Sequence, residues 1–419
     1  MSDTLLTNKL WVHRFNQRLA HLTSDLKSIS KTPVDEKKMR DSFVQVFLPF
    51  HSDTHLRDEY SSHFGKIRVG KVLEDLDALA GYISYVHCAG AEKDLALVTA
   101  SVDRMDLLTN EIPVDRDISL SGHVTYVGKS SMEVTIKLAA VLPESGLTKE
   151  DMESVKFLRT ELPTGFLSNE LILSAKFIMV SLDPVTRRAA AAPQLILETE
   201  AEKILFELGA QHKTRKQSAI QTSLQTTPPT PAEMTLVHSL YIEYMKYLDN
   251  SGNPTPSKPK PSHVIWMKDS RFQNLVLTFP ADRNLHNKIF GGHLMRLAFE
   301  LGYATGAMFS KRPLSFVALD DVTFKFPVEI GAVLDLTAQV VYASNEGKVV
   351  VKVSAHVVQI VDDSKFLSNE FWFTFQTVGE NGSESGAIQV SWNRVLPRSY
   401  DECMLYLEGK RRLEGGAQG

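Results

Sequence analysis

Two stretches of the chain carry the same pattern: residues 66–83 read KIRVGKVLEDLDALAGYI, and residues 288–305 read KIFGGHLMRLAFELGYAT. A shift of 222 positions aligns Gly70 with Gly292 and superimposes the apolar stripes of the two stretches, except at their last position. Apolar residues three and four positions apart form one face of an amphipathic helix. The sequence therefore predicts the same long helix twice.

Strand-like segments follow each of these helices. The pentapeptide FLSNE occurs at 166–170 and again at 366–370, and each copy opens an apolar run. A helix followed by a run of strands is typical of an α+β protein, in which the helix packs on one face of an antiparallel sheet. Alternating segments precede the two copies at 95–104, 117–127 and 131–141, and at 314–322, 333–343 and 348–361.

Two polar segments divide the chain. Residues 212–231 are polar and end in prolines, residues 249–262 are rich in Pro, Ser and Lys, and residues 232–248 between them predict a short amphipathic helix. The predicted parts are an N-terminal helical or extended segment at 1–57, a first domain at 58–210, a linker with a short helix at 211–262, a second domain at 263–385 and a C-terminal tail with a short helix at 386–419.

Composition excludes several classes of protein. The 46 Lys and Arg residues are balanced by 50 Asp and Glu residues, and the formal net charge of −4 argues against nucleic-acid binding as the main task. No apolar run approaches the roughly 18–20 residues that a membrane span requires. The 2 cysteines exclude a disulfide scaffold, and no zinc spacing, P-loop or dinucleotide fingerprint is present. We therefore predict no metal and no cofactor.

The amino terminus allows two interpretations. Residues 1–31 predict an amphipathic, mildly basic helix, which is typical of a mitochondrial transit peptide. The alternative is a surface helix that docks on the first domain of a cytoplasmic protein.

The chain resembles a known family over roughly residues 39–412. It is similar to the tandem-hotdog acyl-coenzyme A thioesterases, and most of all to their mitochondrial group of acyl-coenzyme A thioesterase 9. The resemblance implies two hotdog domains, each a long central helix wrapped by a curled antiparallel sheet, paired about a pseudo-two-fold axis. The segments that carry it are 283–305 and 317–331 in the second half, 67–87 and 119–134 in the first, and the flanks 39–50 and 397–412.

The resemblance also implies an activity. Such a protein hydrolyses fatty acyl-coenzyme A to a free fatty acid and coenzyme A, without a resident cofactor. It also implies a mitochondrial location and a homo-oligomer such as a trimer of double hotdogs. The alternative from another class is a non-catalytic protein that binds or senses acyl-coenzyme A.

Thioester hydrolysis needs an activated water, or an attacking carboxylate, and a donor for the developing oxyanion. The resemblance implies a catalytic Asp seven residues after the last glycine of the turn, which is Asp77. Asp77 lies at the edge of the apolar stripe, where partial burial would raise its pKa and make it a better base. Its neighbours Glu74 and Asp75 are assigned to a solvated acidic face. In the second half Phe299 takes the place of Asp77, and Glu300 beside it is a secondary candidate.

The glycine turn of the second half predicts the rest of the site. Gly291 and Gly292 allow a close approach to the backbone, and the amides near Gly292 and His293 would polarise the thioester carbonyl. The alternative is that these glycines only form a tight loop.

The resemblance further implies an Asn before this turn, facing the Asp of the other domain. Asn287 is the expected partner of Asp77, but it lies five residues before Gly292 where many relatives have four, so Asn284 or His286 could take its role. The first half has the acid without the amide and the second has the amide without the acid. We therefore predict one working site per chain, at the interface of the two hotdog domains.

Overall fold

The structure is a computed structural model, and it does not describe every residue. It describes residues 36–62, 65–90, 95–109, 111–141, 170–221, 224, 227–248, 259–284, 286–360, 364–378 and 392–415, without the side chains of 213–221. The helix predicted at 1–31, the positions 166–169 of the first FLSNE copy and most of the segment 249–262 lie outside these residues.

The chain forms two compact units. The first contains the described residues up to Lys213 together with Asp282–Arg296 and Thr323–Lys325, and the second contains the remainder. The turn that opens the second predicted helix therefore belongs to the first unit.

The predicted repeat is confirmed in the order of the elements. The two long helices have 20 residues each, and their first residues are 222 positions apart. Among the described helices, none has both the length and the apolar character of a membrane span. The first copy contains β1 (Glu36–Lys38), η1 (Met39–Ser42), β2 (Val44–Leu48), α2 (Thr54–Tyr60), α3 (Val69–Cys88), β3 (Ala96–Val102), β4 (Met105–Asp106), β5 (Ile118–Val127), β6 (Ser131–Ala140), β7 (Glu170–Leu182), β8 (Gln194–Ile196) and α5 (Glu200–Gln221). After α6 (Pro231–Met245), the second contains β9 (Val264–Trp266), η4 (Met267–Ser270), β10 (Arg271–Leu277), η5 (Pro280–Asp282), α7 (Gly291–Ser310), β11 (Leu314–Leu319), β12 (Val322–Thr323), β13 (Val333–Ala343), β14 (Lys348–Val358), β15 (Lys365–Thr377), β16 (Arg394–Leu396) and α8 (Tyr400–Gly415).

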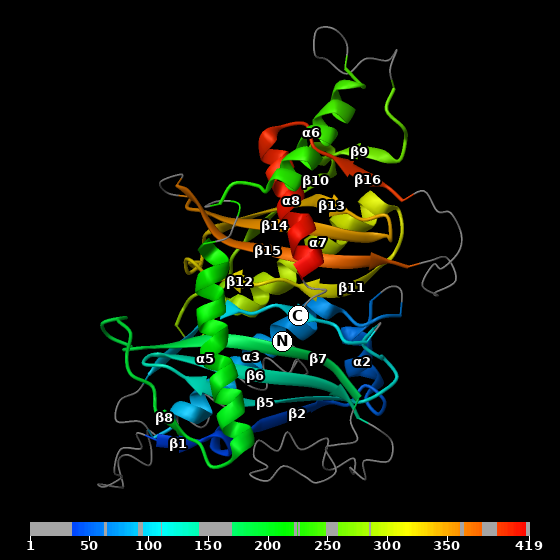
Figure 1. Cartoon of the computed structure of the whole chain (residues 1–419). Helices are drawn as coiled ribbons and strands as arrows, with labels where there is room; N and C mark the ends of the chain where they lie inside the picture. The colour runs from blue at the N-terminus through cyan, green and yellow to red at the C-terminus, as the bar shows by residue number, and fades with distance from the viewer. Residues whose placement is uncertain are drawn as a thin grey trace. The chain divides into compact units, whose positions relative to one another are not determined.

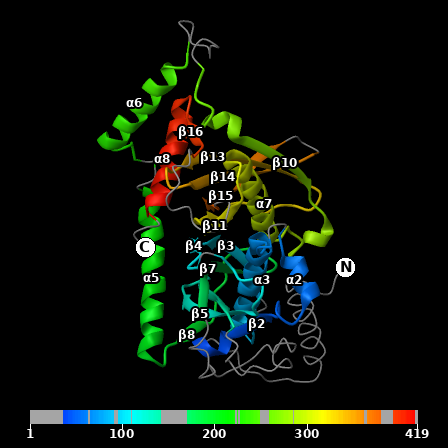
Figure 2. The ribbon, with the colours of Figure 1, turned by 90° about the vertical axis from the view of Figure 1, so that its right-hand side faces the viewer.

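The first unit is a sheet between two helices. Its strands follow the order β3-β7-β6-β5-β2, with antiparallel neighbours throughout. The helix α3 packs on β3, β5, β6 and β7 and buries its apolar stripe, including Leu73, Leu76 and Leu79. The helix α5 covers the opposite face (Figure 2), where the ring of Phe206 packs on that of Tyr126 with centroids 4.9 Å apart.

The second unit repeats this arrangement (Figure 1). Its strands follow the order β10-β13-β14-β15-β11, again antiparallel. In α7, Phe299 packs edge-on against Phe373 of β15 at 5.5 Å between ring centroids. The helix α8 covers the other face through Tyr406, whose ring lies 5.0 Å from that of Tyr342. The prediction of an α+β chain with a long helix on an antiparallel sheet in each half is confirmed.

Even the irregularities of the sheets are repeated. The amide of Val124 donates to the Ser42 hydroxyl at 3.0 Å, and the amide of Val340 donates to the Ser270 hydroxyl at 3.2 Å. A β-bulge follows directly in each strand. A bulge changes which face each side chain points to, so its position has to be kept for the core to pack.

Two predicted boundaries are wrong. The first domain does not begin at 58, because β2 is an edge strand of its sheet and pairs with β5. The stretch 212–231 is not a linker over its whole length, because α5 continues to Gln221. Residues 212–221 contain no Pro or Gly and several good helix formers, which explains why the helix continues there. The short helix predicted at 232–248 is confirmed as α6.

The core of the second unit provides a test of the fold. Phe299 is 6% exposed and packs among aromatic rings, so Phe299→Ala should lower the free energy of unfolding by about 3–5 kcal/mol. The control is Phe279→Ala, because Phe279 is 53% exposed and its loss should change stability by less than about 0.5 kcal/mol. Urea unfolding followed by circular dichroism measures both, and equal effects would contradict the described packing.

Candidate functional site

Asp77 is the centre of the site. It lies on α3 and is 1% exposed. The Thr99 hydroxyl donates to its Oδ1 at 2.8 Å, and the Gly292 amide donates to its Oδ2 at 2.6 Å. Gly292 belongs to the first turn of α7, where amides have no acceptor within the helix and the helix dipole favours a negative charge. The carboxylate therefore occupies the anion position of a helix amino terminus.

The electrostatics of this position favour a base. Burial raises the pKa of Asp77 from 3.8 to about 6, and the hydrogen bonds from Thr99 and Gly292 lower it by less than burial raises it. At neutral pH the carboxylate is therefore mostly ionised, yet it binds a proton more tightly than an exposed Asp does. The expected rise in its pKa agrees with the structure.

Close contacts require a glycine at position 292 and leave little room for a side chain at position 291. A Cβ atom on Gly291 would lie 3.0 Å from Asp77 Oδ2, and one on Gly292 would lie 2.9 Å from Cα and O of Glu74. Without side chains at these positions, the first turn of α7 lies directly on α3. The Gly292 amide, which we expected to polarise a thioester carbonyl, donates here to the carboxylate.

The prediction for the neighbours of Asp77 on α3 is wrong. Asp75 is 2% exposed and accepts a hydrogen bond from the hydroxyl of Tyr60 in α2. Glu74 forms an ion pair with Arg296 at 3.1 Å, and burial raises its pKa to about 7. These carboxylates are covered by α2 and by the first turn of α7, so they do not form a solvated face.

The loop before the glycine turn fixes one Asn and exposes the other. Oδ1 of Asn284 accepts from the amides of His286 at 2.8 Å and Lys288 at 3.2 Å. Asn287 is exposed and has a φ of 56°, a left-handed conformation that Asn tolerates in turns. Within the described part of the chain, its side chain makes no hydrogen bond. Nε2 of His286 lies 3.1 Å from the hydroxyl of Tyr85, which anchors the loop to α3.

Two further candidates from the sequence are placed as follows. Nδ1 of His293 lies 3.1 Å from a guanidinium nitrogen of Arg296 and 3.8 Å from Asp282. Glu300 is exposed on the part of α7 that belongs to the second unit. The structure therefore brings Asp77 to Gly291 and Gly292. The pairing of Asp77 with an Asn stays a prediction.

Sequence reasoning missed Thr99, although the repeat contains a signal for it. Thr99 is the residue before the bulge of β3, and Phe316 is the residue before the matching bulge of β11. The first copy thus has Asp77 and Thr99 where the second has Phe299 and Phe316, whose rings pack 5.6 Å apart. A polar pair in one copy thus corresponds to an aromatic pair in the other, and this difference marks Thr99 as a candidate member of the site.

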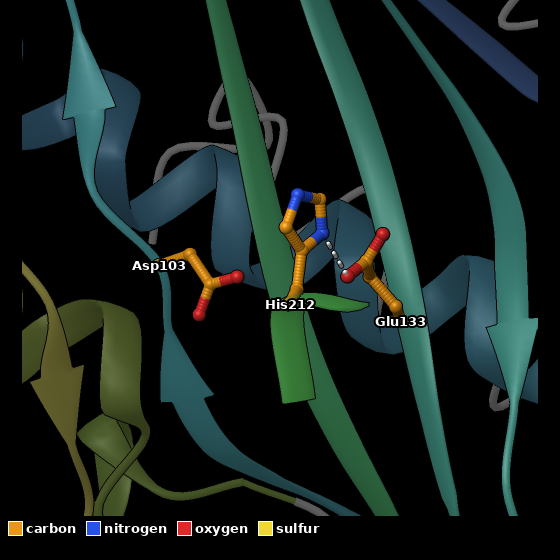
Figure 3. A group of neighbouring side chains, drawn as sticks. All are labelled: Asp103, Glu133 and His212. Atoms are coloured by element: carbon orange, nitrogen blue, oxygen red, sulfur yellow. Dashed lines mark hydrogen bonds and ion pairs between the residues drawn. The ribbon is translucent and has the colours of Figure 1, made fainter. Parts of the chain in front are cut away.

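One group of side chains in the first unit has the composition of a metal site. Asp103, Glu133 and His212 offer ligand atoms that all lie within 4.8 Å of one another (Figure 3). Carboxylate and imidazole groups suit zinc. However, the ammonium group of Lys176 lies 3.1 and 3.2 Å from the two ring nitrogens of His212 and already supplies a positive charge there. The absence of a metal stays a prediction.

Comparison with known proteins defines the class. No protein-family model matches the chain. The acyl-coenzyme A thioesterase 9, mitochondrial, of Bos taurus is 34% identical over 388 residues, which is 92% of this chain and 80% of the relative. The Homo sapiens protein of the same name is 32% identical over 387 residues, with the same coverage. The chain therefore belongs to the acyl-coenzyme A thioesterases. Within them, the predicted similarity to the group of acyl-coenzyme A thioesterase 9 is confirmed.

Similarity extends to a plant relative and to solved structures. The acyl-coenzyme A thioesterase 4, mitochondrial, of Humulus lupulus is 33% identical over 421 residues, covering 97% of this chain and 73% of the relative. An acyl-CoA hydrolase from Staphylococcus aureus is 23% identical with a TM-score of 0.34, and the match covers 37% of this chain and 91% of that one. An acyl-CoA hydrolase from Agrobacterium tumefaciens is 12% identical with a TM-score of 0.26, covering 82% and 98%.

The raised pKa of Asp77 predicts a gain in stability when its charge is removed. The folded state binds this proton more tightly than the unfolded state, so the stabilisation is complete below about pH 3.8 and is lost as the pH rises to about 6. Asp77→Asn keeps a neutral group that accepts from Gly292 and donates to Thr99. We expect the free energy of unfolding of the variant to exceed that of the wild type by on the order of 1–3 kcal/mol at about pH 8. Near pH 4 we expect the two free energies to be equal.

Urea unfolding across this pH range measures the difference. The control is Asp58→Asn, because Asp58 is exposed in α2 and its substitution should change stability by less than about 0.5 kcal/mol throughout. A variant at Asp77 that is less stable than the wild type at about pH 8 would contradict the electrostatic description.

Proposed function

We propose that the protein hydrolyses fatty acyl-coenzyme A to a free fatty acid and coenzyme A. The observation that supports this most directly is the Asp77 carboxylate, which is buried, raised in pKa and held by the first turn of α7. Family membership supplies the substrate class, because the relatives are named acyl-coenzyme A thioesterases.

In this proposal Asp77 is the base or the nucleophile. As a base it takes a proton from a water molecule that attacks the thioester carbonyl carbon. As a nucleophile it attacks that carbon itself, and water then hydrolyses the acyl intermediate. Thr99 and Gly292 bind one carboxylate oxygen each, so the orientation of the group is fixed before the substrate arrives. The sulfur leaves as a thiolate and needs little protonation.

Asn284 is our candidate for the amide of the site, in preference to Asn287. Because Oδ1 of Asn284 already accepts two backbone amides, its Nδ2 group is the part left to donate to a water or to the thioester oxygen. The exposed side chain of Asn287 has no such fixed orientation.

One site per chain completes the proposal. Phe299 and Phe316 fill the second copy of the position with aromatic rings, so that copy has no base to offer.

We further propose that the units are paired hotdog domains and that the chains assemble as trimers. We also propose that the protein acts in mitochondria, as the names of its animal relatives indicate for those proteins.

Removal of the base tests the activity. In Asp77→Asn, the rate of thiol release from palmitoyl-, octanoyl- and acetyl-coenzyme A should fall by about 1,000-fold or more, because the neutral amide cannot take a proton. In the wild type, kcat/KM should fall below about pH 6 as Asp77 becomes protonated. Binding of a non-hydrolysable acyl-coenzyme A analogue to the variant should be retained. No thiol release by the wild type on any chain length, with binding intact, would favour an acyl-coenzyme A binding protein instead.

The two asparagines provide a matched pair for the second test. Asn284→Ala should lower kcat by about 10–100-fold, because one oriented donor is lost, while Asn287→Ala should stay within about twofold of the wild type. Thiol release at saturating substrate measures both variants. The reverse order of effects would move the amide role to Asn287.

A further inference from the structure

Two contacts, one helical turn apart, join α3 to the first two turns of α7. One is the hydrogen bond from the Gly292 amide to Asp77, and the other is the ion pair of Arg296 with Glu74 at 3.1 Å. Arg296 follows Gly292 by four residues and Glu74 precedes Asp77 by three, so each pair shares a helix face. The contacts are therefore neighbouring links along one helix–helix seam.

The seam is tight at the backbone. The missing Cβ of Gly292 would lie 2.9 Å from the backbone of Glu74, so Gly292 rests on the very residue whose side chain binds Arg296. A shift of this turn along α3 would change both contacts together.

Several charged groups act on Glu74. Arg296 favours its ionised form, as does Lys71 from the same helix, while Asp75 and Asp282 oppose it and burial opposes it most. On the other side of the guanidinium, Nδ1 of His293 lies 3.1 Å away. The side chains of Glu74 and Arg296 are 16% and 23% exposed, so water screens this pair less than it screens a surface pair.

We propose that Glu74 and Arg296 form a clamp that positions the Gly292 amide on Asp77 and thereby tunes the base. The inference rests on the proposed function and deepens it. Both are positioning residues, because they act on the reaction through the amide. When the clamp is released, the hydrogen bond from Gly292 weakens, and a carboxylate that loses a donor binds its proton more tightly.

The test is the acidic limb of the pH profile of kcat/KM. In Glu74→Gln and in Arg296→Gln, we expect this limb to move to higher pH by about half a unit or more. We also expect kcat to fall by about 3–10-fold at neutral pH with KM nearly unchanged, because the carboxylate loses part of its fixed orientation. The double variant should show the effect of one single variant and not the sum of two, because both substitutions release the same clamp. Arg296→Lys keeps the charge and should recover part of the activity.

The control is Arg116→Gln, which removes an ion pair of the same unit with Glu170 at 3.2 Å, where both side chains are about half exposed. It should leave the profile unchanged. If Glu74→Gln and Arg296→Gln lose only thermal stability and keep the acidic limb of the wild type, the clamp is wrong while the proposed function stands. If the wild type and the control release no thiol, the proposed function fails.

A second measurement needs no activity. The stability gained through Asp77→Asn reports the folded-state pKa of Asp77, so this gain should be larger in the Glu74→Gln background than in the wild type at about pH 8. An equal gain in the two backgrounds would overturn the clamp even if no substrate were known.

Discussion

A single hydrogen bond, from the Gly292 amide to the Asp77 carboxylate, sets the conditions for the rest of the site. A carboxylate that is 1% exposed loses most of its hydration, and oriented donors have to replace it. An amide in the first turn of a helix is such a donor, since it has no partner within its own helix. To bring that amide within 2.6 Å of Asp77 Oδ2, the turn has to be free of a side chain at Gly292, whose Cβ would lie 2.9 Å from the backbone of Glu74. The glycine at this position thus follows from the close approach that the acid needs.

The two copies of the repeat show a buried carboxylate and an aromatic ring at the same place in the fold. Both copies keep the long helix, the strand order and the bulges, and they differ at the pair of positions that faces the core beside the bulge. In the first copy Asp77 and Thr99 form a hydrogen bond at 2.8 Å, and in the second Phe299 and Phe316 pack at 5.6 Å. The aromatic pair contributes burial of apolar surface, whereas the acid loses solvation. The second copy therefore gains stability at the place where the first copy loses the solvation of an acid.

The helices and strands were predictable where apolar residues recur at a regular spacing along the chain. The stripes of α3 and α7 and the alternation of β13 are visible in the sequence because one face of each element is buried. The strand β2 was missed because a five-residue segment with four buried positions shows no alternation. The end of α5 was misplaced because polar residues of high helix propensity resemble a linker in composition.

The site was predictable to a lesser degree. Asp77 was singled out by the family resemblance, which implies an Asp seven residues after the glycine, and by its place beside the stripe. The covering of Glu74 and Asp75 could not be predicted, because the groups that cover them, Arg296 and Tyr60, come from distant or separate elements. Thr99 could have been found by aligning the bulges of β3 and β11, and that alignment becomes certain only when the strand register is known.

Three carboxylates lie within four residues of α3, two of them buried and Glu74 partly buried, and each is compensated in a different way. Glu74 has the guanidinium of Arg296, Asp75 has the hydroxyl of Tyr60, and Asp77 has a hydroxyl and an amide. Among the described groups that act on the pKa of Asp77, none is a charged side chain. A cation next to Asp77 would stabilise its negative charge strongly and make it a poorer base. Neutral dipoles orient the Asp77 carboxylate without an opposite charge bound to it, whereas the carboxylate of Glu74 is engaged by the guanidinium of Arg296.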